Sequence, residues 1–382
     1  MQHSAKLHGP VPVSDPVSWL STAKTDLPVQ FYSAAALDRR HQQFRAGFPG
    51  EVTFAVKANP SPVVLDQLVA GGMRAFDVAS PEEIALVRAA LPEARLHYHN
   101  PVRSMAEIAY GLAAGVTSWS VDDLGELNKL IRAGVTGEVA VRFALPVRGA
   151  AYDFGAKFGA TPADAVVLLK AVVCAGLTPS LTFHVGTQCP TPAPWAAYLT
   201  HAAQIAQAAD VRLHRLNVGG GFPSARNGME PDYDSFFKVI RAALDLFDAP
   251  PALVCEPGRG LVADAFAYAV QVKSIRTTSS QGGRVYLNDG IYGGLSEFPS
   301  IGLPAFRVIG ADGHIKSGPT QTAIVYGPTC DSLDHLPGEI ALPETLEPGD
   351  WLLFRAMGAY MFGVTTRFNG YGTWENVSVT DL

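Results

Sequence analysis

The chain has 382 residues, of which 48% are hydrophobic and 17% charged, so its composition is that of a folded globular protein and excludes a largely disordered or fibrous one. The 29 basic and 35 acidic residues give a net charge of -6, and no basic run could neutralise nucleic-acid phosphates or lipid headgroups. No apolar run reaches the about 18 residues of a membrane span, and the N-terminus lacks the features of a signal peptide. We therefore expect a cytoplasmic protein of two domains, with neither a nucleic-acid nor a membrane partner.

Short β-branched runs alternate with Ala- and Leu-rich segments in the first two thirds of the chain. The helix-like segments include 80–90, where Ser80 and Glu83 have the spacing of a capping box. Eight such β-then-α units predict a (β/α)8 barrel, although an open doubly wound sheet would give the same alternation. The eight predicted strands are 52–56, 74–78, 95–99, 117–121, 138–143, 180–185, 212–218 and 252–256.

The pattern changes after about residue 261. Strand-like runs are then separated by Gly, Pro and Asp turns, with no long amphipathic helix between them, which predicts a C-terminal β-domain of sandwich or barrel-like type. We place the barrel at 33–261 and assign 1–32 and 262–382 to the β-domain, because the first stretch is expected to add a strand to it.

Reactive residues gather where the predicted barrel strands end. The carboxyl ends of the strands carry the active site in barrels of this kind, so we expect the site there. The four cysteines lack the paired spacing of a zinc site or a disulfide framework, and a metal held by His97 and His99 has no further ligand cluster to support it. The strand-end residues are Lys57, Asp77, His99, Asn100, Asp122, Arg142, His184, Asn217 and Glu256.

Three of these positions suggest particular chemistry. Lys57 follows an apolar run, so its amine would be partly desolvated and suited to a Schiff base, whereas the plainer interpretation is a lysine reaching solvent from a strand end. The glycines 219–221 after Asn217 allow backbone N–H groups to approach a phosphate, or form a turn without a ligand. Glu256 followed by Arg259 suits a protonated heterocycle and a phosphate, or a simple ion pair.

Two of the cysteines are candidate reactive groups. Cys189 with His184 could form a Cys-His pair, but this leaves Lys57 and the three glycines without a role. Cys330 stands beside Asp331 in a turn of the C-terminal domain, which puts a thiol next to a carboxylate.

Taken together, ten segments make the sequence resemble the fold type III pyridoxal-phosphate (PLP) decarboxylases, the alanine-racemase-like barrel family, and within it the ornithine and diaminopimelate decarboxylase group. The resemblance implies an alanine-racemase-type barrel, a C-terminal β-domain and PLP as cofactor. The segments occur in the order of the family: FAVKANP, FDVASPEEI, HNPVRS, KFGA, FHVGTQC, NVGGGFP, CEPGRG, NDGIYGG, GPTCDSLD, and MGAY with FNGY.

The resemblance also implies roles for individual residues. Lys57 would form the Schiff base with PLP, Glu256 would bond the pyridine nitrogen, and His184 would stack on the ring. Racemases of this fold present arginine to that nitrogen, so the glutamate favours a decarboxylase. The remaining cofactor residues would be Asp77, Glu83 and Arg142 around the ring, and Thr187, Gly219, Gly220, Gly221, Gly258, Arg259 and Tyr360 around the phosphate.

For the substrate, the resemblance implies that Cys330 donates a proton and Asp331 binds the distal ammonium, both acting in the neighbouring subunit of a homodimer. We expect decarboxylation of L-ornithine to putrescine, with lysine, arginine, diaminopimelate or a less polar amino acid as alternative substrates. A noncatalytic regulatory homologue or PLP carrier is the alternative of a different class. One departure matters: Ser300 and Ile301 replace a Tyr-Asp pair of the eukaryotic enzymes, and Glu297 is the nearest carboxylate.

Overall fold

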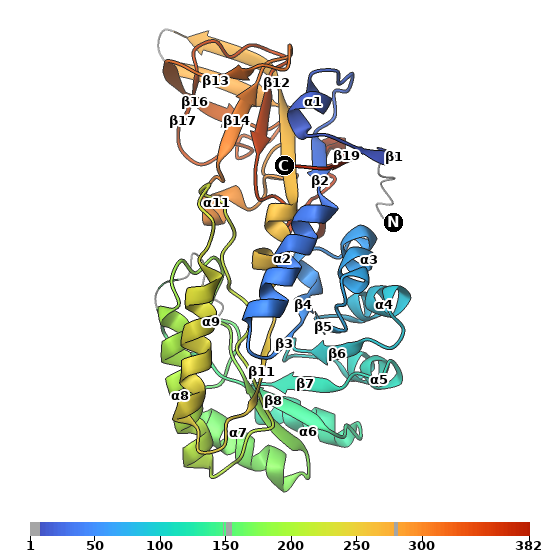
Figure 1. The fold of residues 1–382 in the computed structure, drawn as a ribbon, viewed down its shortest axis with the longest axis vertical. Coiled ribbons are helices and arrows are strands. Elements are labelled where there is room, and N and C mark those ends of the chain that lie inside the picture. The colour runs from blue at the N-terminus through green and yellow to red at the C-terminus, as the bar shows by residue number, and fades with distance from the viewer. Residues whose placement is uncertain (1–7, 148, 150–154, 279–281) are drawn as a thin grey trace. The chain divides into compact units, whose positions relative to one another are not determined.

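The computed structural model describes residues 8–147, 149, 155–278 and 282–382, and the chain divides into two compact units (Figure 1). The first unit comprises residues 40–223 and 231–261, and the second comprises the described residues up to 39 together with 224–230 and 262–382. Residues 33–39 and 224–230, which we expected in the barrel domain, belong to the second unit instead.

The first unit is a closed barrel of parallel strands. The predicted strand before Lys57 forms two short pieces. The first, β3 (Glu51–Val52), pairs with the last strand of the barrel, and the second, β4 (Phe54–Ala55), pairs with the strand that follows it in the chain. Because the two edges of the sheet are consecutive in the chain, the sheet closes on itself, which confirms the predicted barrel and excludes the open sheet. The other strands are β5 (Ala75–Val78), β6 (Arg95–Tyr98), β7 (Ser118–Val121), β8 (Glu138–Arg142), β9 (Thr178–Thr182), β10 (Arg215–Asn217) and β11 (Ala252–Cys255).

Helices follow these strands and lie outside them (Figure 1). Their starts are fixed by side-chain caps: Ser104 and Glu107 form a capping box, and Ser80 accepts from the backbone N–H of Glu83. The Glu83 carboxylate accepts from Ala79 N–H, one residue before the cap. The helices are α3 (Pro62–Ala70), α4 (Pro81–Ala90), α5 (Met105–Ala113), α6 (Leu124–Arg132), α7 (Pro162–Cys174), α8 (Ala193–Ala209) and α9 (Tyr233–Ala242), with the short η1 (Val56–Ala58), η2 (Ala243–Leu246) and α10 (Arg259–Val262).

The second unit is a mostly antiparallel sheet built around β12 (Phe266–Thr278). This strand pairs with β2 (Val29–Tyr32), so the early part of the chain adds a strand to the sheet. The sheet also contains β1 (His8–Val13), β13 (Gly282–Leu287), β14 (Phe306–Ile309), β15 (Ile315–Lys316), β16 (Thr320–Tyr326), β17 (Ile340–Pro343), β18 (Trp351–Phe354) and β19 (Glu375–Val379). The helical segments are α1 (Pro16–Leu20), the first residues of α2 (Ala34–Gly47), which from residue 40 on belongs to the first unit, η3 (Ala263–Ala265), α11 (Phe298–Ile301), α12 (Met361–Val364) and η4 (Phe368–Gly370).

Strand β12 carries hydrophobic core on both faces. Tyr268 and Val270 belong to one buried cluster, whereas Ala267 and Ala269 belong to another. Because alternate residues of a strand point to opposite faces, the sheet is packed on both sides, as in a layered β-domain.

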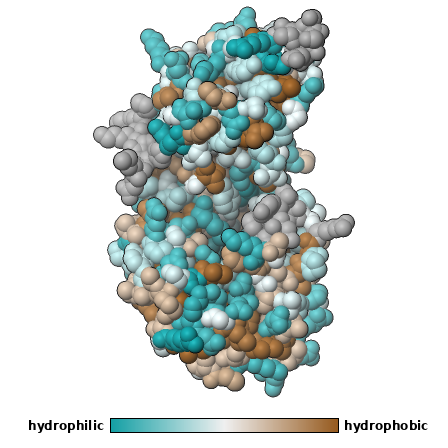
Figure 2. Space-filling view, turned by 180° about the vertical axis from the view of Figure 1, so that it is seen from behind, coloured by the Kyte–Doolittle hydropathy of each residue, from teal (hydrophilic) through white to brown (hydrophobic). Residues whose placement is uncertain are grey.

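Within the described ranges, no helix is both long and apolar enough to cross a membrane. The exposed large hydrophobic side chains are scattered over many elements. Figure 2 shows hydrophilic and hydrophobic residues mixed over the visible face of each unit.

Candidate active site

The carboxyl ends of two neighbouring barrel strands bring an amine and a carboxylate together. Lys57 lies in η1 directly after β4, and Asp77 lies in β5, where it pairs with Ala55. The Lys57 Nζ atom is 3.3 Å from Asp77 Oδ2, and Asp77 is buried. Burial and the charge of Glu256 raise the pKa of Asp77 to about 7, although Lys57 opposes the shift. Asp77 Oδ1 has no hydrogen-bond partner among the described residues.

A second buried carboxylate follows the last barrel strand. Glu256 Oε1 is 2.7 Å from His99 Nδ1, and Asn217 Nδ2 donates to the same oxygen. Asn217 Oδ1 accepts from the backbone N–H of Gly219 at 2.9 Å, which fixes the orientation of this amide. Burial favours the neutral acid, but the charge and hydrogen bond of His99, with help from Lys57 and Asn217, lower the pKa of Glu256. Glu256 is therefore ionised at neutral pH.

The three glycines after β10 form a turn that other residues cannot replace. Gly219 and Gly221 have φ angles of +66° and +99°, in the left-handed region that favours glycine. A Cβ atom on either would overlap the backbone carbonyl of Phe183 or Gly186, and one on Gly220 would lie 2.8 Å from a backbone carbonyl oxygen. The turn is thus packed backbone to backbone against the neighbouring strand ends.

The imidazole of His184 lies beside this turn and is neutral. Its Nδ1 atom accepts from the backbone N–H of Gly186 at 3.0 Å. Desolvation, together with the positive charges of Arg142 and Lys57, lowers the pKa of His184 to about 3. A neutral ring suits stacking on a flat heterocycle without adding charge to it.

Arg259 and Thr187 lie close together, at the same end of the barrel as the glycine turn. Arg259 begins α10 immediately after Gly258, and its Nε atom is 3.5 Å from Thr187 Oγ1. Arg259 is buried. A buried guanidinium next to a hydroxyl and a glycine turn is a donor set suited to a phosphate.

Arg142 and Glu83 are two further sequence-predicted residues in the barrel. Arg142 ends β8 with its guanidinium 5.3 Å from the ring centre of Phe158, and burial lowers its pKa against the charge of Glu256. Burial raises the pKa of Glu83, whose carboxylate bonds the backbone N–H of Ala79.

The turn that contains Cys330 lies in the second unit and is held by a buried aspartate. Asp334 accepts from the N–H and the hydroxyl of Thr329 at 3.1 and 2.7 Å. Cys330 is exposed, and the Asp331 carboxylate accepts a hydrogen bond from the hydroxyl of Tyr292. This hydrogen bond is the main cause that lowers the pKa of Asp331, so the turn presents an exposed thiol beside an ionised carboxylate.

Two further predicted residues also lie in the second unit. Tyr360 precedes α12 with φ of +63°, an unusual backbone for a residue with a side chain. Glu297 is half-buried and directly precedes α11, the short helix that contains Ser300 and Ile301.

The ligand set of the barrel fits a phosphorylated pyridine better than a metal. Asp77, His99 and Glu256 place potential metal-ligand atoms within 4.8 Å of one another, but both His99 nitrogens already bond Glu256 and Ser118. An ionised buried carboxylate, an amine and an anion-accepting glycine turn at one barrel end match the ring nitrogen, the aldehyde and the phosphate of PLP. We conclude that the residues present fit this cofactor.

From the sequence, His99 and Asn217 were expected at strand ends, His99 with no role beyond that of an unsupported metal ligand and Asn217 with none. Their pairing with Glu256 joins three strands that are far apart in the chain, and the position at a strand end was the available signal. Asp334 was missed entirely, since an aspartate in a loop is common and its burial cannot be read from the sequence.

This fold and this site define a PLP-dependent barrel enzyme of fold type III. Residues 34–263 match the family model for the pyridoxal-dependent decarboxylase, pyridoxal binding domain. The chain is 31% identical to mouse ornithine decarboxylase, over 89% of this chain and 78% of the mouse protein, and 31% identical to Xenopus laevis antizyme inhibitor 2, over 87% and 76%. Among solved structures, lysine/ornithine decarboxylase from Vibrio vulnificus in complex with cadaverine is 28% identical, with a TM-score of 0.81 over 93% of this chain and 95% of that one.

The chain belongs to the PLP-dependent decarboxylase family. It is an amino-acid decarboxylase, a carboxy-lyase, and its cofactor is PLP.

Proposed function

We propose that the protein decarboxylates a basic L-amino acid, with L-ornithine as the preferred substrate, and releases putrescine and carbon dioxide. The observation that carries the choice of substrate is the ionised Asp331 carboxylate beside the Cys330 thiol. A carboxylate held by a tyrosine hydroxyl suits the distal ammonium of a diamino acid. The relatives named for ornithine and lysine support the same substrate class.

The barrel residues hold the cofactor. Lys57 is the amine that carries PLP, and Glu256 bonds the ring nitrogen and keeps it protonated. His184 stacks on the ring, while Asp77, Glu83 and Arg142 surround it. When bound, PLP supplies the electron sink for the charge that loss of carbon dioxide leaves on Cα. The phosphate is held by Thr187, Arg259, Tyr360 and the backbone of Gly219, Gly220, Gly221 and Gly258.

Cys330 donates the proton that Cα receives after carbon dioxide has left. Its exposure in the single chain supports a homodimer in which the Cys330 turn of each subunit completes the site of the other. Glu297 supplies a second acidic group for the distal ammonium, in place of the missing Tyr-Asp pair. We infer no noncatalytic role, because Lys57, Glu256 and Cys330 are all present.

Replacing Asp331 with asparagine will lower kcat/KM for L-ornithine and L-lysine at least about tenfold, mainly through KM, because a neutral amide replaces the partner of the distal ammonium. The measurement is amine release from L-ornithine, L-lysine, L-arginine and meso-diaminopimelate by the PLP-loaded enzyme. Asp312→Asn, which changes an exposed aspartate elsewhere in the second unit, is the matched control. Equal kinetics for the two variants, or a preference for a substrate without a distal ammonium, would contradict the proposal.

A further inference from the structure

His99 connects the Glu256 carboxylate with the interior of the barrel. Its Nδ1 atom is 2.7 Å from Glu256 Oε1, and its Nε2 atom is 2.9 Å from the hydroxyl of Ser118 on β7. Asn217 donates to the same Glu256 oxygen. Two donors thus converge on Oε1, and neither of them engages Oε2.

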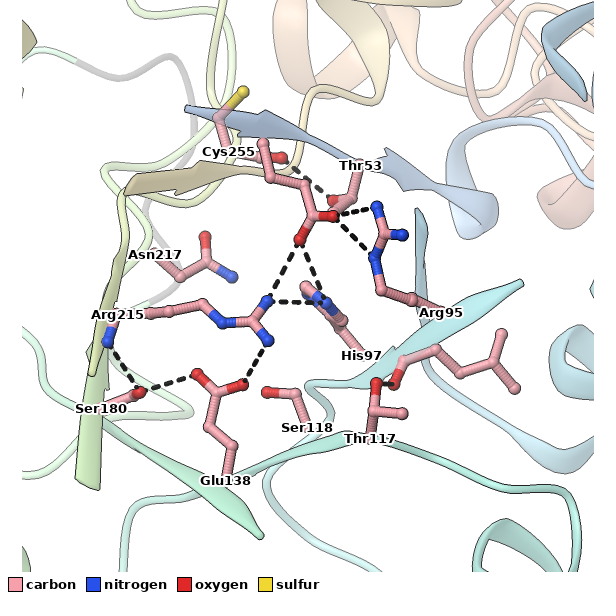
Figure 3. Close-up of polar contacts among 12 residues, drawn as sticks. Thr53, Arg95, His97, Thr117, Ser118, Glu138, Ser180, Arg215, Asn217 and Cys255 are labelled. Atoms are coloured by element: carbon pink, nitrogen blue, oxygen red, sulfur yellow. Dashed lines mark hydrogen bonds and ion pairs between the residues drawn. The ribbon is translucent and has the colours of Figure 1, made fainter. Parts of the chain in front are cut away.

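A second polar layer packs beside His99. The ring of His97, two residues earlier on β6, lies 5.5 Å from the His99 ring at a tilt of 31°. Arg215 on β10 places Nη1 3.4 Å from His97 Nε2, and its guanidinium pairs with Glu51 and Glu138 at 3.1 and 3.3 Å (Figure 3). These contacts come from four different strands, so they fix the position of the His97 ring.

The two histidines share the barrel interior, but their pKa values are shifted in opposite directions. Burial and the neighbouring His99 lower the pKa of His97 to about 4, so this ring is neutral. For His99, burial opposes the charged form, but the charge and hydrogen bond of Glu256 outweigh it and raise its pKa. Two further acids that raise it are Asp77 on β5 and Glu138 on β8. Of the two rings, His99 is the one whose pKa is raised, and it is also the one that bonds the carboxylate.

We propose that His99 is a positioning residue for the cofactor: it donates a charged hydrogen bond to Glu256 Oε1, which keeps the carboxylate ionised and turned so that Oε2 meets the ring nitrogen of PLP. This inference rests on the proposed role of Glu256. Asn217 supports it as a neutral second donor, and Ser118 holds the far side of the imidazole. Without His99, Glu256 is a buried carboxylate with a single neutral donor, which takes up a proton or turns away more readily.

A double-mutant cycle on PLP affinity tests the inference. His99→Phe removes both hydrogen bonds and keeps most of the volume, and we expect it to weaken PLP binding about tenfold in equilibrium dialysis, the size of one lost charged hydrogen bond. In a Glu256→Gln background the same substitution should change the affinity less than about twofold, because His99 acts only through the carboxylate. His99→Asn, which keeps a neutral donor, should give an intermediate loss, and it carries the test if His99→Phe does not fold.

Two serines on β7 give a matched control that does not depend on turnover. Ser118 Oγ bonds His99, whereas Ser120 Oγ, two residues along the same buried strand, has no hydrogen-bond partner among the described residues. An NMR titration of the apoprotein should show His99 titrating above the ordinary imidazole value of about 6.5. Ser118→Ala should move this titration, Ser120→Ala should leave it in place, and Glu256→Gln should lower it.

The outcomes separate the inference from the proposed function. If Glu256→Gln leaves PLP affinity unchanged, the proposed role of Glu256 fails. If Glu256→Gln weakens binding but His99→Phe has the same effect in both backgrounds, or if His99 titrates below about 6.5, the role of Glu256 stands and the inference about His99 is overturned.

Discussion

Alanine in place of Lys57 will abolish covalent retention of PLP and lower the rate of decarboxylation at least about 10⁴-fold. The physical reason is that Lys57 Nζ, beside Asp77 at the barrel end, is the amine that we propose to carry the cofactor, and an amine from solvent cannot match its effective concentration. The measurement combines the visible absorbance of the protein after dialysis with the rate of carbon dioxide release. Lys170→Ala, at an exposed position on α7, is the control and should retain both.

Full absorbance and turnover in the Lys57→Ala protein would show that another group carries the cofactor. Loss of both properties in the Lys170→Ala control would instead point to general damage to the barrel.

The second large effect is expected at Cys330. Cys330→Ala should bind PLP normally but release carbon dioxide about 10²-fold more slowly, since the proposed proton donor is lost. It should also form less than one amine per carbon dioxide, because the proton is no longer delivered to Cα alone. The measurement is the ratio of amine to carbon dioxide, with Cys174→Ala, an exposed cysteine on α7, as control. An unchanged rate and a ratio of one would remove Cys330 from the chemistry.

The same variant tests the proposed homodimer. Lys57→Ala and Cys330→Ala chains, mixed in equal amounts and allowed to exchange, should regain about a quarter of the wild-type activity. Half of the dimers would then be mixed, and each mixed dimer would have one intact site. No recovery despite subunit exchange would mean that Lys57 and Cys330 act within one chain.

The sequence predicted the barrel because eight β-branched runs alternate with helix-like segments. Ser80 caps a helix at the expected place, and Ser104 caps the next helix. What the alternation could not decide was closure, which depends on the short pieces on either side of Thr53 pairing with different strands.

The individual site residues were predictable as a set, since Lys57, Asp77 and Glu256 all stand at strand ends. Their electrostatics were not predictable. The low pKa of Glu256 and the raised pKa of Asp77 depend on which buried partners each carboxylate meets, and the partner of Glu256 is His99, 157 positions away in the chain. The same holds for the Cys330 turn, which the sequence indicated but whose support by Asp334 follows only from its burial.

Release of carbon dioxide from carboxyl-labelled L-ornithine by the purified, PLP-loaded protein tests the central claim most directly, with L-lysine and L-arginine measured beside it. We expect release with one putrescine formed per carbon dioxide, and faster turnover of L-ornithine than of the other two. A protein that retains PLP on Lys57 yet releases no carbon dioxide from any of the three would contradict the proposed decarboxylation of basic amino acids.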